Sequence, residues 1–420
     1  MMKETGGERG KKITANFQYV RQLALQGFHH RGFTVKRVSG GLTELRRILT
    51  VNLREGMVIA KTIFSPSGRV LLRKDTVIKP VFIESLLDRK VMSVFIRDQR
   101  FPDLEPEEVV SDRTRMRVRE ALAEFREAAQ SRSRRALIIA SDHIAQRVAD
   151  IVEEALSHRS VVVNLTDIGS MDDYTFDHSV NVCIISVLAA CHMNINAEKI
   201  RLLGIGALLH DVGKLLVPPA VMRKPGKLTD EESDVVKNHS EDGYRFLSRQ
   251  TDLSPLSTIV AYQHHERWDG SGYPLGLKGD EIHQFSQLVG IADVYDALVS
   301  DRVYREAFPP HRALAMINGS AERFFPGALV SQFLENLAPY PVGTVIELTN
   351  GVTAVVADVQ RGSLYHPCIR ALTDEDGVNL SESSQYQFEL SDHPNLQIYR
   401  VIDKDEQSER SISTGLTASS

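Results

Sequence analysis

A histidine and an aspartate stand side by side at positions 210 and 211, at the end of an apolar run from Ile205 to Leu209. The run predicts a buried helix with Gly213 as its C-terminal cap. Two ionisable side chains at a buried helix end are costly unless they are neutralised, and a divalent cation would do so with an imidazole nitrogen and a carboxylate oxygen as ligands. Lys214 follows His210 by one turn and would suit a phosphate bound to such a metal. Taken alone, the pair fits a solvated helix end better than a metal site.

Further candidate ligands occur at intervals that match one helix plus its loop. They are His178 upstream, and His239, His264, His265 and Asp293 downstream. A helical bundle can project such side chains inward from several helices. Any single one of the 14 histidines is better explained as a surface residue, but seven His and Asp residues in one helical stretch favour a metal centre. Adjacent helical residues point about 100° apart, so the helix that ends in two imidazoles could serve two neighbouring metals.

The composition bounds the class of protein. With 420 residues, 42% hydrophobic and 25% charged, the chain can form two or three globular domains. A net charge of −5 argues against a broad basic nucleic-acid surface. The three cysteines lack CxxC spacing and predict reduced thiols in a cytoplasmic protein. The longest apolar run, Val180 to Cys191, is too short for a membrane span, so we expect neither a span nor a signal peptide.

The N-terminal part of the chain divides into three predicted segments. Residues 1–44 are basic without a sustained apolar period, which predicts a disordered leader, with a basic arm for lipid or nucleic acid as the alternative. Residues 45–100 alternate in short runs and predict a small β-rich module with one helix near Val81–Leu87. Residues 101–159 predict a linker and two lead-in helices, 112–131 and 141–158, the second with Ser141 as its N-cap.

The C-terminal part also divides into three predicted segments. Residues 160–338 form the expected all-helical domain, in which Thr229, with Glu232 at the capping-box position, starts the helix that carries His239. Residues 339–403 predict a small β-barrel-like module with a hairpin turn at Asn350-Gly351. Residues 404–420 are polar and predict a disordered tail.

A tight loop follows the two adjacent histidines. Residues 266–274 concentrate Gly270, Gly272 and Pro274, which indicates a special backbone conformation. Beside metal ligands, Arg267 or Tyr273 of this loop could stack on a base or meet a phosphate. The alternative is that the loop only caps the helix.

Read together, these motifs resemble the HD-GYP subgroup of the HD phosphohydrolase superfamily. The resemblance covers roughly residues 160–338, and its most specific block is residues 264–274, which end in Gly-Tyr-Pro. The fold it implies is multidomain and mainly α: an all-helical HD-GYP metal-binding bundle flanked by small β-rich N-terminal and C-terminal modules.

The resemblance also implies an activity, a metal-dependent cyclic di-GMP phosphodiesterase that yields linear pGpG in bacterial signal transduction, with further cleavage to GMP left open. The implied cofactors are two iron or manganese ions. A third ion is left open, because Asp172 and Asp173 stand where some members have a glutamate, and Asp173 is its candidate ligand. Catalytic roles fall to Asp211, as a bridge between two ions, and to Lys214. Lys214 and Arg305 would contact the scissile phosphate, and the implied metal ligands are His178, His210, Asp211, His239, His264, His265 and Asp293.

Two other functions stay open at this point. One is a non-catalytic receptor that binds cyclic di-GMP or a diguanylate cyclase, and the full ligand set argues against it. The other is a hydrolase of a different cyclic dinucleotide. A diguanylate cyclase or another signalling protein is the candidate protein partner, a homodimer is the candidate assembly, and no nucleic acid polymer is expected.

Overall fold

The computed structural model describes residues 44–60, 62–64, 70–89, 91, 93–98, 109–131, 133–158, 174–222, 224, 226–300, 307–381 and 384–402. The described part of the chain from Tyr340 onward forms one compact unit, and the part from Leu45 to Pro339 forms another. The predicted leader up to residue 43, the predicted tail, Asp172, Asp173 and Arg305 lie outside the described residues, and Glu44, the last residue of the predicted leader, begins a strand.

Residues 44–98 contain two short sheets and a helix. Strand β1 (Glu44–Leu49) pairs with β4 (Ser93–Asp98), and β2 (Ile63–Phe64) pairs antiparallel with β3 (Val70–Leu72). Helix α2 (Pro80–Asp88) lies where the sequence predicts one. The apolar residues of the strands and of α2 share one small core, which includes Ile59, Ile78 and Leu86.

The helical domain is built around one helix that is buried on all sides. In α5 (Tyr174–His192), every residue from His178 to Cys191 is buried, and the helix packs against α6 (Ala197–Leu208) and α11 (Gln284–Val299). This explains the apolar run without a polar face. Among the described residues, no helix is long and apolar enough to cross a membrane.

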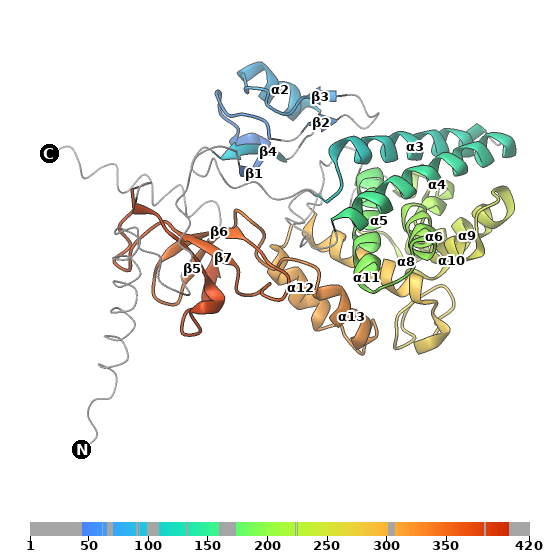
Figure 1. Ribbon diagram of the computed structural model, residues 1–420. Helices are drawn as coiled ribbons and strands as arrows, with labels where there is room; N and C mark the ends of the chain where they lie inside the picture. The colour runs from blue at the N-terminus through green and yellow to red at the C-terminus, as the bar shows by residue number, and fades with distance from the viewer. Residues whose placement is uncertain are drawn as a thin grey trace. The chain divides into compact units, whose positions relative to one another are not determined.

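The two lead-in helices also contact α5. The lead-in helices α3 (Asp112–Ser131) and α4 (Arg134–Ser157) lie side by side (Figure 1). The remaining elements are η3 (Val212–Leu216), α7 (Pro219–Met222), α8 (Asp230–Lys237), α9 (His239–Gln250), α10 (Pro255–Gln263), η4 (Gly279–Glu281), α12 (Pro310–Asn318) and α13 (Gly327–Leu334).

The start of α4 differs from the prediction. The N-cap is Ser133, whose side chain accepts a hydrogen bond from the Ala136 amide at 3.3 Å. Ser141 lies inside the helix, buried, and its Oγ donates to the Leu137 carbonyl at 2.7 Å. The predicted N-cap at Ser141 was therefore wrong, because a serine can also satisfy its hydroxyl on the preceding helical turn.

The segment around His210 also departs from a single helix. Helix α6 ends at Leu208 with Leu209 as its C-cap, and Gly213 lies within the 3-10 helix η3. The predicted cap at Gly213 was wrong. A Cβ atom at Gly213 would lie 1.9 Å from the His239 carbonyl oxygen, so the glycine is required by the close approach of η3 to α9.

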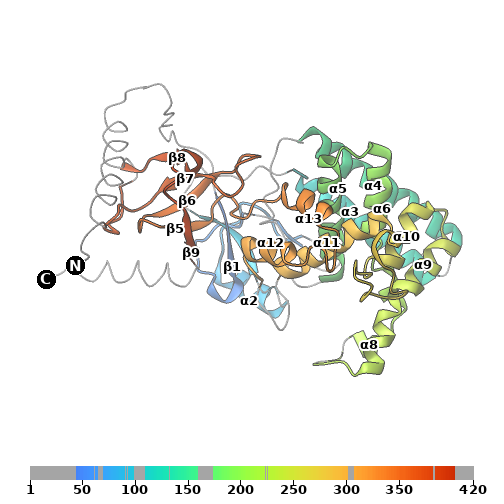
Figure 2. The same cartoon turned by 90° about the horizontal axis from the view of Figure 1, so that it is seen from below.

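The predicted capping box of α8 is confirmed. The Thr229 side chain accepts from the Glu232 amide at 3.3 Å, and Glu232 Oε2 accepts from the Thr229 amide at 2.8 Å. Helix α8 contains no buried residue, and Figure 2 shows it projecting from the other helices of the domain. His239 was predicted on this helix but begins α9, because α8 ends at Lys237.

The C-terminal unit is a five-stranded antiparallel sheet in the order β8-β7-β6-β5-β9. Its strands are β5 (Val345–Leu348), β6 (Thr353–Asp358), β7 (Cys368–Ala371), β8 (Gln387–Glu389) and β9 (Ile398–Val401). The hairpin turn at Asn350-Gly351 is confirmed, with Gly351 at φ 87° and the Leu348 amide donating to the Val352 carbonyl at 2.9 Å. The described strands form an open sheet with β8 and β9 at its edges, rather than the expected barrel-like form.

Candidate metal centre

The structure brings all seven predicted metal ligands together in the helical domain. They come from α5, the connection between α6 and η3, the start of α9, the end of α10 and α11. Two groups of possible ligand atoms lie close enough to hold an ion, and both include Asp211. The first group is His178, His210 and Asp211, and the second is Asp211, His239, His264 and His265.

The two oxygens of Asp211 face different histidines. Oδ2 lies 3.4 Å from His210 Nε2 and 3.8 Å from His178 Nε2. Oδ1 lies 3.3 Å from His239 Nε2 and 3.8 Å from His264 Nε2. The carboxylate therefore stands between two sets of imidazoles, with one oxygen directed at each.

Asp293 completes the cluster from α11. Its Oδ1 lies 3.2 Å from His178 Nε2, and its Oδ2 lies 4.0 Å from His265 Nδ1. It leans toward the His178 side but reaches both groups.

Hydrogen bonds orient the imidazole rings. The Nδ1 atoms of His210, His239 and His264 lie 2.7, 2.6 and 3.1 Å from the main-chain carbonyls of residues 207, 236 and 260. Because a carbonyl only accepts, each Nδ1 carries the hydrogen and each Nε2 presents its lone pair to the cluster. This is the tautomer that a histidine needs to bind a metal through Nε2.

Two buried acceptor atoms without hydrogen-bond partners indicate which kind of ligand the cluster can bind. His210 Nε2 and Asp211 Oδ1 are buried and have no hydrogen-bond partner among the described residues. An unsatisfied buried acceptor costs roughly 1–3 kcal/mol. Lone pairs of imidazole and carboxylate that converge in a buried space are the donor set of a divalent transition metal, so the residues fit divalent metal ions.

The protonation states agree with that fit. Burial lowers the pKa of His264 well below its usual range and that of His265 to about 3, so both rings are neutral. Burial acts to raise the pKa of Asp211, but Lys214 and His210 outweigh it and hold this pKa well below the usual range. Neutral imidazoles and ionised carboxylates are the forms that bind metals.

His178 is the exception. Burial acts to lower its pKa, but hydrogen bonds with Asp293 and Asp296 outweigh burial and raise the pKa to about 10. Two carboxylates thus place a positive charge at this point of the cluster. A metal cation would take the place of that proton.

The predicted substrate-binding residues take different positions. Lys214 Nζ lies 2.5 Å from Asp211 Oδ2. The Tyr273 ring lies 4.7 Å from the His265 ring, so it borders the cluster. Arg267 instead donates to the Glu266 and His264 carbonyls at 3.1 and 3.3 Å and lies over the Phe325 ring. Its present contacts therefore support the loop. Arg305 and Asp173 lie outside the described residues.

The sequence interpretation assigned no role to Glu266, which holds the loop after the two histidines. Glu266 is buried, and its carboxylate accepts from the amides of Leu275 and Leu277 at 2.7 and 3.0 Å. A Cβ atom at Gly272 would lie 2.4 Å from the Arg267 nitrogen, so the loop folds tightly back on itself. The signal in the sequence was an acidic residue directly after the metal-ligand pair.

Asp296 was also left without a role. It is fully buried, and its Oδ2 accepts from His178 Nδ1 at 2.7 Å. Its spacing of three residues from Asp293 indicated a shared helix face, but not which ring the face meets.

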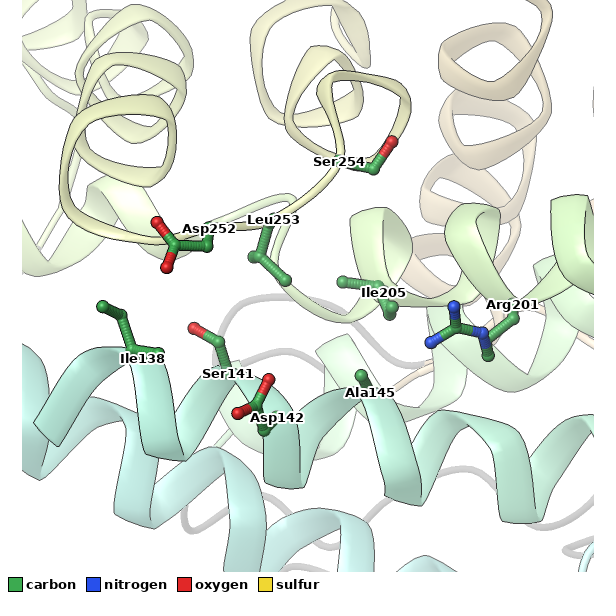
Figure 3. A pocket seen from close by; sticks show the side chains of 9 residues that line it. All are labelled: Ile138, Ser141, Asp142, Ala145, Arg201, Ile205, Asp252, Leu253 and Ser254. Atoms are coloured by element: carbon green, nitrogen blue, oxygen red, sulfur yellow. The ribbon is translucent and has the colours of Figure 1, made fainter. Parts of the chain in front are cut away.

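A separate hollow of about 310 Å³ lies between α4, α6 and the connection from α9 to α10 (Figure 3). Its lining includes Asp142, Arg201, Ile205 and Leu253. None of the seven candidate metal ligands lines it. It is therefore not part of the candidate metal centre.

Comparison with known proteins shows what the domain that carries this centre is similar to. Residues 176–328 match the model of the HD domain, and residues 345–410 match that of a KOW domain associated with HD domain. The chain is 34% identical over 54% of its length to 55% of a cyclic di-GMP phosphodiesterase of Pseudomonas aeruginosa. It is 34% identical over 52% of its length to 57% of a cyclic di-GMP phosphodiesterase response regulator of Xanthomonas campestris. It is 40% identical over 34% of its length to 31% of a 3′3′-cGAMP-specific phosphodiesterase of Vibrio cholerae.

The chain thus spans about half the length, or less, of these curated relatives. The matched region of the chain contains all seven candidate ligands together with the Gly272-Tyr273-Pro274 loop. The helical domain is thus similar to the HD domain family over residues 176–328, and the relatives named above are phosphodiesterases of cyclic di-GMP or 3′3′-cGAMP.

Proposed function

We propose that this protein is a metal-dependent phosphodiesterase that hydrolyses cyclic di-GMP to linear pGpG. The observation that carries the proposal is the position of Asp211, whose two oxygens face two separate sets of imidazoles. A carboxylate in that position can bind two metal ions at once. Relatives named as cyclic di-GMP phosphodiesterases support the choice of substrate.

The ligands divide between two ion positions, which we define by their histidines. The His178 side consists of His178, His210, Asp293 and Asp211 Oδ2. The His239 side consists of His239, His264, His265 and Asp211 Oδ1. Mixed imidazole and carboxylate ligands suit iron or manganese. When bound, divalent ions act as Lewis acids on phosphoryl oxygens and lower the pKa of water.

Exposure shows from which side a phosphate can approach. The side chains of His178, His210, Asp211, His239 and His264 are at most 5% exposed. Three side chains of the cluster are more exposed: Asp293 at 14%, His265 at 17% and Lys214 at 28% of the side-chain surface. The substrate phosphate would therefore enter beside Lys214, with Tyr273 next to His265 on the same approach.

Lys214 is suited to bind that phosphate. Its ammonium group lies against Asp211 and cannot itself bind a cation. A charge-assisted hydrogen bond from Nζ to a non-bridging phosphate oxygen would orient the phosphodiester and stabilise the charge that develops during attack. Arg305 stays a prediction as a second phosphate contact, and Asp173 stays a prediction as a ligand of a third ion.

A second candidate substrate is 3′3′-cGAMP, because a relative 40% identical over 146 residues is named for it. The two substrates share the cyclic phosphodiester and differ in one base. The metal centre would treat both alike, so base recognition decides between them.

The full chain, purified without oxygen and analysed for metal, should be offered cyclic di-GMP, 3′3′-cGAMP and cyclic di-AMP. We expect hydrolysis of cyclic di-GMP to a linear dinucleotide, and no turnover by an Asp211→Ala control. Metal-loaded protein that binds a cyclic dinucleotide without cleaving it would instead identify a receptor. Faster turnover of 3′3′-cGAMP would assign that substrate.

A further inference from the structure

The surroundings of His178 differ from those of the other oriented imidazoles. His210, His239 and His264 each give their Nδ1 hydrogen to a neutral main-chain carbonyl. His178 gives its Nδ1 hydrogen to the carboxylate of Asp296 at 2.7 Å. Asp293 meets the opposite nitrogen of the same ring at 3.2 Å, so α11 supplies a carboxylate to each nitrogen of His178.

Burial of the Asp296 carboxylate lowers the stability of the folded domain unless it is compensated. The Asp296 side chain is fully buried, and its Oδ1 has no hydrogen-bond partner in the part of the chain that the structure describes. A buried carboxylate with one partner lowers stability unless positive charge lies close to it. The charged partner that the described residues show for this carboxylate is the His178 ring, together with whatever its Nε2 binds.

A carboxylate behind a metal-binding imidazole strengthens that ligand. It withdraws the Nδ1 hydrogen, which makes the Nε2 lone pair more basic, and it adds negative charge close to the ion. Among the four candidate ligand rings whose Nδ1 partner the described residues show, His178 alone has a carboxylate there. The His239 side has three imidazoles and shares Asp211, and Asp293 approaches it less closely, with Oδ2 at 4.0 Å from His265 Nδ1 against 3.2 Å from Oδ1 to His178 Nε2.

We propose that Asp296 is a positioning residue that makes the two ion positions unequal, so that the His178 side holds its ion more tightly and the His239 side loses its ion first. The inference rests on the proposed two-ion centre and concerns its affinity rather than its substrate. A further consequence is that partly loaded protein contains mainly one ion, on the His178 side.

Single-ion variants allow the affinity of each side to be measured directly. His239→Ala leaves the His178 side complete, and His178→Ala leaves the His239 side with its imidazoles intact. The probe is Mn²⁺, titrated into metal-free full-length protein, with free Mn²⁺ followed by electron paramagnetic resonance. We expect tighter binding by the His239→Ala protein than by the His178→Ala protein.

Asp296→Asn then tests the cause. Asparagine has nearly the same shape and keeps an oxygen that accepts from His178 Nδ1, so it removes the charge and retains the hydrogen bond. In the His239→Ala background, we expect Asp296→Asn to weaken Mn²⁺ binding by about 10–100-fold, the usual effect of losing a second-layer partner of a metal ligand. In the His178→Ala background, the same change should leave the affinity unaltered.

Glu154→Gln is the matched control. It removes a part-buried carboxylate from the same domain, one that bonds Ser111 and Thr114. It should leave Mn²⁺ affinity unaltered in both backgrounds. Thermal unfolding of each metal-free variant verifies the fold.

Wild-type protein gives a test that needs no variant. Graded chelation of fully loaded protein should release the ions in two steps. Release in one step, or an equal loss of affinity from Asp296→Asn in both backgrounds, would overturn the inference. Protein that binds two Mn²⁺ ions unequally but cleaves no cyclic dinucleotide would overturn the proposed function and leave this inference standing.

Discussion

Replacement of Gly213 by alanine tests how the metal centre is assembled from separate helices. The new Cβ atom would lie 1.9 Å from the His239 carbonyl oxygen and 2.7 Å from the Gly243 nitrogen, whereas ordinary contact begins at 3.4 Å. Helix α9 and η3 would have to separate by about 1.5 Å, and both atoms in the way belong to the backbone. Metal ligands tolerate errors of only about 0.2 Å. His239 would thus be moved out of reach of an ion that Asp211 also binds.

The expected size of the effect follows from overpacking. Forcing an extra carbon into a packed interior costs roughly 1–3 kcal/mol. For a domain of this size, each kcal/mol lowers Tm by about 2–4 °C, so we expect a decrease of roughly 2–12 °C. Metal content should fall by one ion per chain, measured by elemental analysis, and hydrolysis should fall with it.

Gly319→Ala is the matched control for this substitution. Gly319 has φ −65°, and the nearest atoms to its new Cβ would lie at 3.5 and 3.6 Å. Alanine fits there without strain and should stabilise the protein by about 0.4–1 kcal/mol, because it restricts the unfolded chain. Gly213→Ala protein with two ions and an unchanged Tm would refute the reasoning.

Three further predictions concern Asp211, Lys214 and Thr229. Asp211→Ala should lose bound metal and hydrolysis together while its circular dichroism stays helical, and normal turnover at full metal loading would remove Asp211 from the mechanism. Lys214→Ala should retain its metal and lose about one to two orders of magnitude in kcat, since a charge-assisted bond contributes roughly 1.5–3 kcal/mol; loss of the metal would mark Lys214 as a structural residue instead. Thr229→Ala should weaken α8 by about 1 kcal/mol. Because α8 buries no residue, amide exchange should rise there without a change in global Tm, and a lower Tm would show that α8 supports the core.

The sequence predicted which side chains gather in the helical domain, because they follow from local motifs. Imidazoles and carboxylates at helix-and-loop intervals indicated a metal centre in a helical domain, and the structure gathers all seven. The capping box at Thr229 was equally readable, since both of its hydrogen bonds join residues three apart.

Features that depend on a contact between two segments far apart in the sequence could not be predicted from the sequence. Gly213 satisfied the pattern of a helix cap, and only the approach of α9 shows why a side chain is excluded. The partner of Asp296 lies 118 residues away on α5. The break before His239 was hidden for another reason: Asn238 ends α8 with a helical backbone, φ −61° and ψ −15°, and no glycine or proline marks the stop.

The contact between Gly213 and His239 brings together the two ends of the segment between them, so that this segment forms a closed loop. This segment contains α7 and α8, and both of its ends lie at the Gly213–His239 contact. Neither helix has a buried residue. Lengthening such a loop should change the stability of the contact at its base only slightly, because each doubling of the length of a flexible loop costs only about 0.6 kcal/mol. Residues 226–228 are exposed and lie within this segment, so we expect them to be a permissive position, where a fluorophore or an inserted peptide leaves the metal centre unaltered.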